Sequence, residues 1–121
     1  MTGDLQHLTE RLRTFSHERG WEQFHTPRNL LLALVGEVGE LAELAQWRTD
    51  EEIAHELADG QLHARVADEA ADVLLYLTRL TDVCGIDLVQ AGHDKLDRNH
   101  TRFPIADRSS TASRDPQHRE D

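Results

Sequence analysis

The sequence has few of the residues that cross-link or interrupt a chain. It holds one cysteine, three prolines, seven glycines and, as aromatic residues, three Phe, two Trp and one Tyr among 121 residues. A single cysteine, Cys84, excludes a disulfide within the chain and fits a reducing compartment. The composition is typical of a charge-rich helical protein rather than a β-sandwich or barrel, and we find no strand-like alternation and no internal repeat.

Long hydrophobic stretches are also missing. No apolar run reaches the length of about 18 residues that a membrane span needs. No basic segment is followed by an apolar one in the manner of a secretory signal. We therefore expect a cytoplasmic protein with no membrane partner.

Positive charge is scarce as well. The chain has 13 Lys and Arg against 23 Asp and Glu, which gives a formal net charge of -10 at pH 7. A field of this sign repels phosphate backbones and anionic membranes, so nucleic acid is not an expected partner. An acidic chain can nevertheless hold a phosphorylated small molecule when divalent cations lie between the two sets of negative charge.

Helical periodicity dominates what the sequence does contain. The length suits one domain, and apolar residues recur three and four positions apart. This spacing predicts an all-α fold with long helices over 4–20, 27–47 and 61–84, a short acidic helix from Thr49 to about 59, and a last helix over 87–100. Residues 106–121 lack large apolar side chains, so we expect a domain over 1–105 and a disordered tail over 106–121.

Four carboxylates occupy unusual positions on two of the long helices. At about 100° per residue, Glu37 lies within the apolar stripe of its helix and Glu40 at the edge of that stripe. Glu69 lies in the apolar arc of the 61–84 helix, and Asp72 follows three residues later. The spacing turns both members of each pair the same way. Carboxylates that meet on facing helices repel one another unless they are protonated or bind cations.

The four acids predict a site for a hard divalent cation. Carboxylate oxygens select Mg²⁺, or Mn²⁺, rather than zinc. Two other interpretations stay open: the pairs can be ordinary solvent-facing charges, or the ligands of a di-iron bundle. Di-iron bundles use Glu-x-x-His on two helices, and no histidine stands at position 40 or 72.

The residues around these acids resemble a known family. Glu37-x-x-Glu40 followed by Glu69-x-x-Asp72 is similar to the bipartite metal motif of the MazG-like, all-α nucleoside triphosphate pyrophosphatases. The similarity is closer to their dCTP pyrophosphatase branch. It is carried by Trp21-Glu22-Gln23-Phe24-His25, by the run from Pro27 to Leu44, and by Gln46-Trp47, and it extends from about Leu5 to Pro104.

The resemblance implies a four-helix MazG-like bundle assembled as a homodimer or a dimer of dimers. It implies Mg²⁺-dependent hydrolysis of dCTP, or of a modified dCTP, to dCMP and pyrophosphate, which sanitises the nucleotide pool. The catalytic and metal-binding residues that it implies are Glu37, Glu40, Glu69 and Asp72. The implied substrate-binding residues are Trp21, Glu22, Gln23, Phe24, His25, Trp47 and Tyr76, with Lys95, Asn99 and Arg102 from the closing motif. The chain departs from the branch at Leu12, where a histidine can stand, and at Phe103, which replaces a tyrosine.

Other interpretations of these side chains stay open. Either tryptophan can fill a core, His25 can be a solvated histidine, and the three polar residues of the last helix can face solvent. Cys84, near a helix end, is interpreted as a core thiol. The chain can also act on another nucleotide, or be a catalytically silent oligomerisation module. Loss of one acid would mark the silent module, and all four acids are present.

Overall fold

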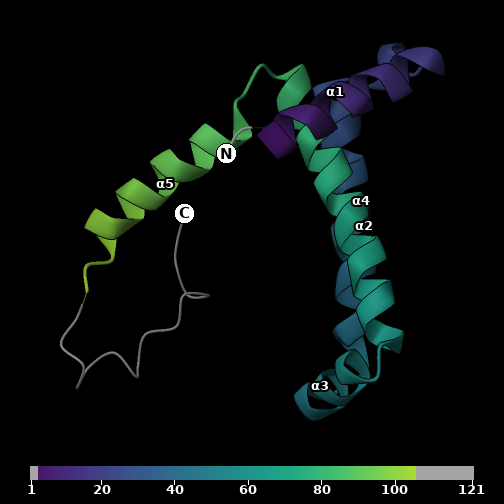
Figure 1. Cartoon of the computed structure of the whole chain (residues 1–121), viewed down its shortest axis with the longest axis vertical. Coiled ribbons are helices and arrows are strands. Elements are labelled where there is room, and N and C mark those ends of the chain that lie inside the picture. The colour runs from purple at the N-terminus through teal and green to yellow at the C-terminus, as the bar shows by residue number, and fades with distance from the viewer. Residues whose placement is uncertain (1–2, 106–121) are drawn as a thin grey trace. The chain divides into compact units, whose positions relative to one another are not determined.

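The structure, a computed structural model, describes residues 3–105 and is all-α over that range, which confirms the predicted fold class (Figure 1). Its elements are α1 (Gly3–Glu18), the 3₁₀ turn η1 (Glu22–Phe24), α2 (Pro27–Gln46), α3 (Asp50–Ala58), α4 (Gln61–Val83) and α5 (Leu88–Arg102). Every predicted helix is present, with ends close to those expected. The expected disordered tail, 106–121, lies outside the described residues, and the extent of the domain stays a prediction.

The chain divides into two compact units between Val89 and Gln90. In the first unit, α2 and α4 lie side by side and make its main contact (Figure 1). α2 starts where the Thr26 hydroxyl accepts a hydrogen bond from the backbone N–H of Asn29 (3.2 Å). α4 starts after Gly60, whose φ of 93° is a left-handed conformation that glycine adopts without strain.

Hydrogen bonds fix the short connection between α2 and α4. Thr49 and Glu52 form a capping box at the start of α3, each side chain accepting a bond from the other residue's backbone N–H. Arg48 donates to the backbone carbonyl of Leu44 (2.6 Å) and to the Glu56 carboxylate (3.0 Å). α3 in turn packs against α4. The end of α2 is therefore tied to the helix that leads into α4.

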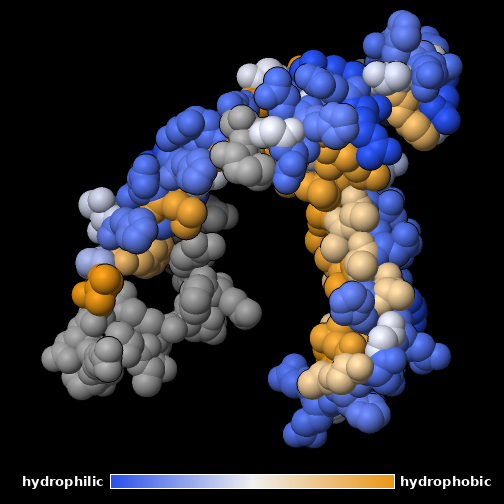
Figure 2. Space-filling view, in the orientation of Figure 1, coloured by the Kyte–Doolittle hydropathy of each residue, from blue (hydrophilic) through white to orange (hydrophobic). Residues whose placement is uncertain are grey.

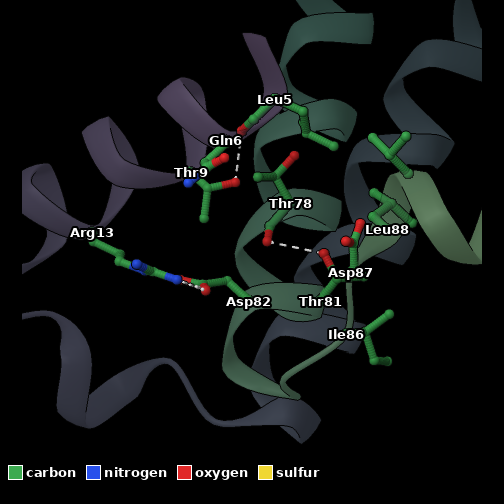
Figure 3. Close-up of a pocket in the computed structure, with 11 residues that line it drawn as sticks. Leu5, Gln6, Thr9, Arg13, Thr78, Thr81, Asp82, Ile86, Asp87 and Leu88 are labelled. Atoms are coloured by element: carbon green, nitrogen blue, oxygen red, sulfur yellow. Dashed lines mark hydrogen bonds and ion pairs between the residues drawn. The ribbon is translucent and has the colours of Figure 1, made fainter. Parts of the chain in front are cut away.

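The first helix packs on the C-terminal half of α4. A hollow of about 360 Å³ lies between them, and the residues that line it include Arg13 and Asp82, which form an ion pair (Figure 3). The buried residues of these two segments are small and carry hydroxyl groups: Ser16, Thr78 and Thr81. Thr81 satisfies its hydroxyl by donating to the carbonyl oxygens of its own helix, as Figure 3 marks for the bond to Thr78.

Few apolar side chains are buried within the described part of the chain. Leu30, Leu44 and Leu62 are the buried hydrophobic residues there. Four apolar side chains of α2 are instead exposed: Leu31, Leu32, Val35 and Val38. Figure 2 shows apolar residues along the α2 and α4 pair. The interpretation of Cys84 as a core thiol is wrong, because its side chain is exposed just after α4 ends.

The second unit begins within α5 and contains most of that helix. Its first polar contact along the helix is the bond from the Gln90 amide to Asp94 (2.9 Å). Near the end of α5 the Arg102 guanidinium lies 5.2 Å from the centre of the Phe103 ring. Between residues 3 and 105, no helix is both long and apolar enough to cross a membrane.

Candidate metal centre

Three of the four predicted acids meet where α2 and α4 lie together. Glu37 and Glu40 project from α2 and Glu69 from α4, and each offers a carboxylate oxygen within 4.8 Å of the others. Asp72, one turn further along α4, is close enough for its charge to act on both Glu37 and Glu69. The structure thus brings together three of the four predicted acids, and their role as metal ligands stays a prediction.

The cluster contains carboxylate oxygens that have no partner. One oxygen of Glu37 and one of Glu69, Oε2 in both cases, is buried and accepts no hydrogen bond from any described group. Glu40 is within hydrogen-bonding reach of the two other carboxyls through their remaining oxygens. A buried oxygen without a donor is costly, and a bound cation is one partner that such an oxygen can take. The donor set, carboxylate oxygen throughout, fits a hard divalent ion.

Crowding and burial change the acidity of the cluster. Burial, followed by the charge of Glu40, raises the pKa of Glu37 above its ordinary value. The same two causes, in the same order, raise the pKa of Glu69. Without a cation, the folded chain therefore holds protons on these groups more tightly than the unfolded chain does.

A cavity of about 220 Å³ opens beside Asp72. Trp21 and His25 form one side of it, before α2, and Tyr76 of α4 forms another. The rings of Trp21 and His25 meet edge to face, with centroids 6.3 Å apart. Leu12 also lines this cavity, so the residue at which the chain departs from the branch contributes an apolar surface there.

Trp47 lines a different cavity from Trp21 and Tyr76. Its side chain is 85% exposed, and it borders a hollow of about 380 Å³ together with Glu40, Glu69 and Arg65. Within a single chain the acids thus lie between two cavities, with one tryptophan in each. A core role for Trp47 within this chain is excluded by its exposure.

The remaining predicted substrate residues of the first unit line neither cavity. Glu22 accepts a bond from His17 (2.9 Å), Gln23 donates to the Gly20 carbonyl (3.3 Å), and Phe24 is 60% exposed. The other three predicted residues, Lys95, Asn99 and Arg102, belong to the second unit. The six residues remain candidates from sequence only.

Comparisons with known proteins show the family to which the chain belongs. The model of the MazG-like family matches residues 33–114. The chain belongs to this family. It is 53% identical over 91 residues to dCTP pyrophosphatase 1 of Bos taurus and to that of Mus musculus, covering 75% of this chain and 54% of each relative. The chain therefore spans about half the length of the curated relatives that it matches.

A solved structure extends the similarity to the fold of this MazG-like chain. A pyrophosphatase from Archaeoglobus fulgidus DSM 4304 superposes with a TM-score of 0.76 at 38% sequence identity. The match covers 83% of this chain and 92% of that one.

Two arginines were missed by the sequence argument. Arg65 borders the Trp47 cavity and stands four residues before Glu69 on α4. Arg79 borders the Trp21 cavity and donates to His25. One feature of the sequence pointed to Arg79, because it is a positive charge three residues after Tyr76 on a helix rich in apolar residues. Helical spacing on α4, however, gives no information about the loop that holds His25, 54 residues away in the sequence.

The raised pKa of Glu69 generates a stability prediction for the metal-free protein. The proton on Glu69 stabilises the folded state, because the folded state binds it more tightly than the unfolded state does. This stabilisation is fully present below the ordinary pKa of 4.5 and is lost as pH rises through the raised value. Glu69→Gln keeps the shape without the charge. We expect it to be neutral or stabilising near pH 7, with the gain disappearing at about pH 4.

Urea denaturation in EDTA at the two pH values measures this effect. Glu51→Gln removes the same charge from the exposed surface of α3 and should not gain stability. A folded Glu69→Gln variant that is less stable than the parent near pH 7 would show that the acids do not repel one another.

Proposed function

We propose that this chain is a Mg²⁺-dependent nucleoside triphosphate pyrophosphohydrolase that converts dCTP, or a modified dCTP, to dCMP and pyrophosphate in the cytoplasm. The observation that carries the proposal is the meeting of Glu37, Glu40 and Glu69 with two orphaned oxygens. The activity and the base come from the curated relatives named dCTP pyrophosphatase 1. The proposed role is removal of unwanted nucleotides from the pool.

The acids would hold the phosphate end of the substrate through Mg²⁺, with Glu37, Glu40, Glu69 and Asp72 as its ligands. When bound, Mg²⁺ neutralises phosphate charge and lowers the pKa of a coordinated water. A carboxylate of the cluster accepts a proton of the attacking water, and this water hydrolyses the phosphoanhydride bond between the α and β phosphates. Arg65, beside Glu40 and Glu69, supplies positive charge for the leaving pyrophosphate.

The base would enter the cavity formed by Trp21, His25 and Tyr76. Aromatic rings offer a stacking surface to a flat base. Asp72 borders both this cavity and the acid cluster, which supports a substrate that reaches from one to the other. The experiment below distinguishes this proposal from its two alternatives, which are action on a different nucleotide and a catalytically silent module.

The proposal predicts pyrophosphate as product. A panel of the four dNTPs and four NTPs with Mg²⁺ should give the fastest turnover with dCTP, measured as pyrophosphate and orthophosphate separately. Glu69→Gln should reduce turnover by orders of magnitude because the metal geometry is lost, and Mg²⁺ should raise the melting temperature of the parent.

Three results would contradict the proposal. Orthophosphate as the main product would exclude cleavage between the α and β phosphates. Another preferred base would redirect the substrate assignment. No turnover with any triphosphate would favour the silent module.

Trp47 provides a second prediction. Because Trp47 lines a different cavity from Trp21 in its own chain, we propose that its exposed ring stacks on a nucleotide bound by a second copy of the chain, so Trp47→Ala should weaken substrate binding by about 1 to 3 kcal/mol. Its stability should change little, because the ring buries little surface in this chain. Trp47→Phe keeps a ring and should recover most of the affinity. Isothermal titration of a non-hydrolysable dCTP analogue measures the three proteins, and equal affinities would remove Trp47 from the site.

We also propose that the chain is a homo-oligomer, a dimer or a tetramer. Leu31, Val35 and Val38 form an exposed apolar stripe on α2, and an apolar surface of this kind is typical of an interface with another protein. Gly36 and Gly39 beside it leave space, since an added Cβ at either would meet no described atom within 4 Å. Sedimentation should give a mass well above 13.8 kDa, and Val35→Asp should reduce it. A parent that sediments as a 13.8 kDa species at micromolar concentration would refute this proposal.

A further inference from the structure

His25 is held by a chain of polar contacts that begins on another helix. Arg79 donates from Nε to Nδ1 of His25 (3.0 Å) and from a terminal nitrogen to Asp82 (3.3 Å). Asp82 also accepts two bonds from Arg13 of α1, the longer of them 2.8 Å, which Figure 3 shows. The loop before α2, the C-terminal half of α4 and α1 are thus joined through three charged side chains.

The direction of the first bond determines the proton position on the imidazole. An arginine side chain donates hydrogen bonds and never accepts them. Nδ1 of His25 must therefore present a lone pair to Arg79, so a neutral ring carries its proton on Nε2. Burial and the charge of Arg79 also lower the pKa of His25, which favours the neutral ring.

Asp82 holds the guanidinium in place. The side chains of Arg79 and Asp82 are 11% and 13% exposed, so the pair is largely shielded from water. Arg13 lowers the pKa of Asp82 by hydrogen bonding, and the carboxylate stays ionised. A guanidinium bound to Asp82 at one edge has its Nε–H directed at His25, with little freedom to turn away.

We propose that Arg79 is a positioning residue that fixes the Nε2–H tautomer of His25, so that this ring offers one hydrogen-bond donor to the base and favours cytosine over thymine and uracil. The inference rests on the proposed function. His25 lines the cavity assigned to the base, and Nε2 is the ring nitrogen that Arg79 leaves free. Arg79 acts through His25 and has no part in the acid cluster.

The chemistry of the pyrimidine edge explains the preference. N3 of cytosine accepts a hydrogen bond, whereas N3 of thymine or uracil carries a proton. An Nε2–H donor matches the first and leaves two donors facing each other in the second. Unpaired polar groups in a site discriminate strongly between otherwise similar ligands. The opposite tautomer would present an acceptor and reverse the preference.

Nuclear magnetic resonance tests the tautomer directly. Two-bond ¹H–¹⁵N correlation spectra of the full chain report which imidazole nitrogen is protonated, and His25→Gln assigns the signal among the eight histidines. The parent should show a neutral His25 with the proton on Nε2. Arg79→Met removes the donor, so His25 should become a mixture of tautomers. An unchanged Nε2–H signal in Arg79→Met would overturn the inference.

Kinetics tests the consequence for the base. The ratio of kcat/KM for dCTP to that for dTTP should fall about tenfold in Arg79→Met, through a higher KM for dCTP with kcat nearly unchanged. Arg11→Met, which removes an exposed arginine of α1, should keep the parental ratio. Arg79→Lys keeps the charge but lacks the planar guanidinium, so it should also lose selectivity. It serves as the folded variant if the methionine variant does not fold.

The outcomes separate this inference from the proposed function. A parent that prefers dCTP, with variants that keep both the preference and the tautomer, overturns the inference alone. A loss of kcat with an unchanged ratio also overturns it, because Arg79 would then affect the reaction and not the base. A parent that hydrolyses no dNTP overturns the proposed function and the selectivity together, and the tautomer spectrum still shows whether Arg79 orients His25.

Discussion

Like charge held at close range is the constraint on which the α2 and α4 pair depends. Glu37, Glu40 and Glu69 approach within 4.8 Å on helices that elsewhere pack apolar side chains. The packing of the helices brings the carboxylates together, and the burial of two of their oxygens leaves repulsion that water screens only in part. The metal-free fold therefore contains an unfavourable interaction among the carboxylates of its candidate site, as is common at functional sites.

The apolar side chains add a second constraint. Only Leu30, Leu44 and Leu62 are buried hydrophobic residues in the described part of the chain, while one whole stripe of α2 is exposed. Three such side chains are a small core for a unit of this length. The polar contacts of Arg48 with Leu44 and Glu56, and of Arg13 with Asp82, consequently do much to set how the helices meet.

The helices, and the direction in which each pair of acids points, could be predicted from sequence because both follow from local rules. Thr26 and Thr49 precede their helices as N-caps, and an i, i+3 spacing determines which way a pair of side chains points. The division of the tryptophans between two cavities could not be predicted, because helical spacing does not say what stands opposite a residue. The exposure of Cys84 and the bond from Arg79 to His25 could not be predicted for the same reason.

One face of α4 carries Glu69, Asp72 and Tyr76, so the acid cluster, the wall of the cavity and an aromatic ring follow one another along a single helix. At about 1.5 Å per residue, the seven steps from Glu69 to Tyr76 span roughly 10 Å. Under the proposed function, the helix thus sets how far the base of the substrate lies from the phosphates to which it is joined. Inserting one residue between Glu69 and Tyr76 would rotate the ring by about 100° about the helix axis. The ring and the acids would then no longer lie on one face of α4, although every side chain would still be present.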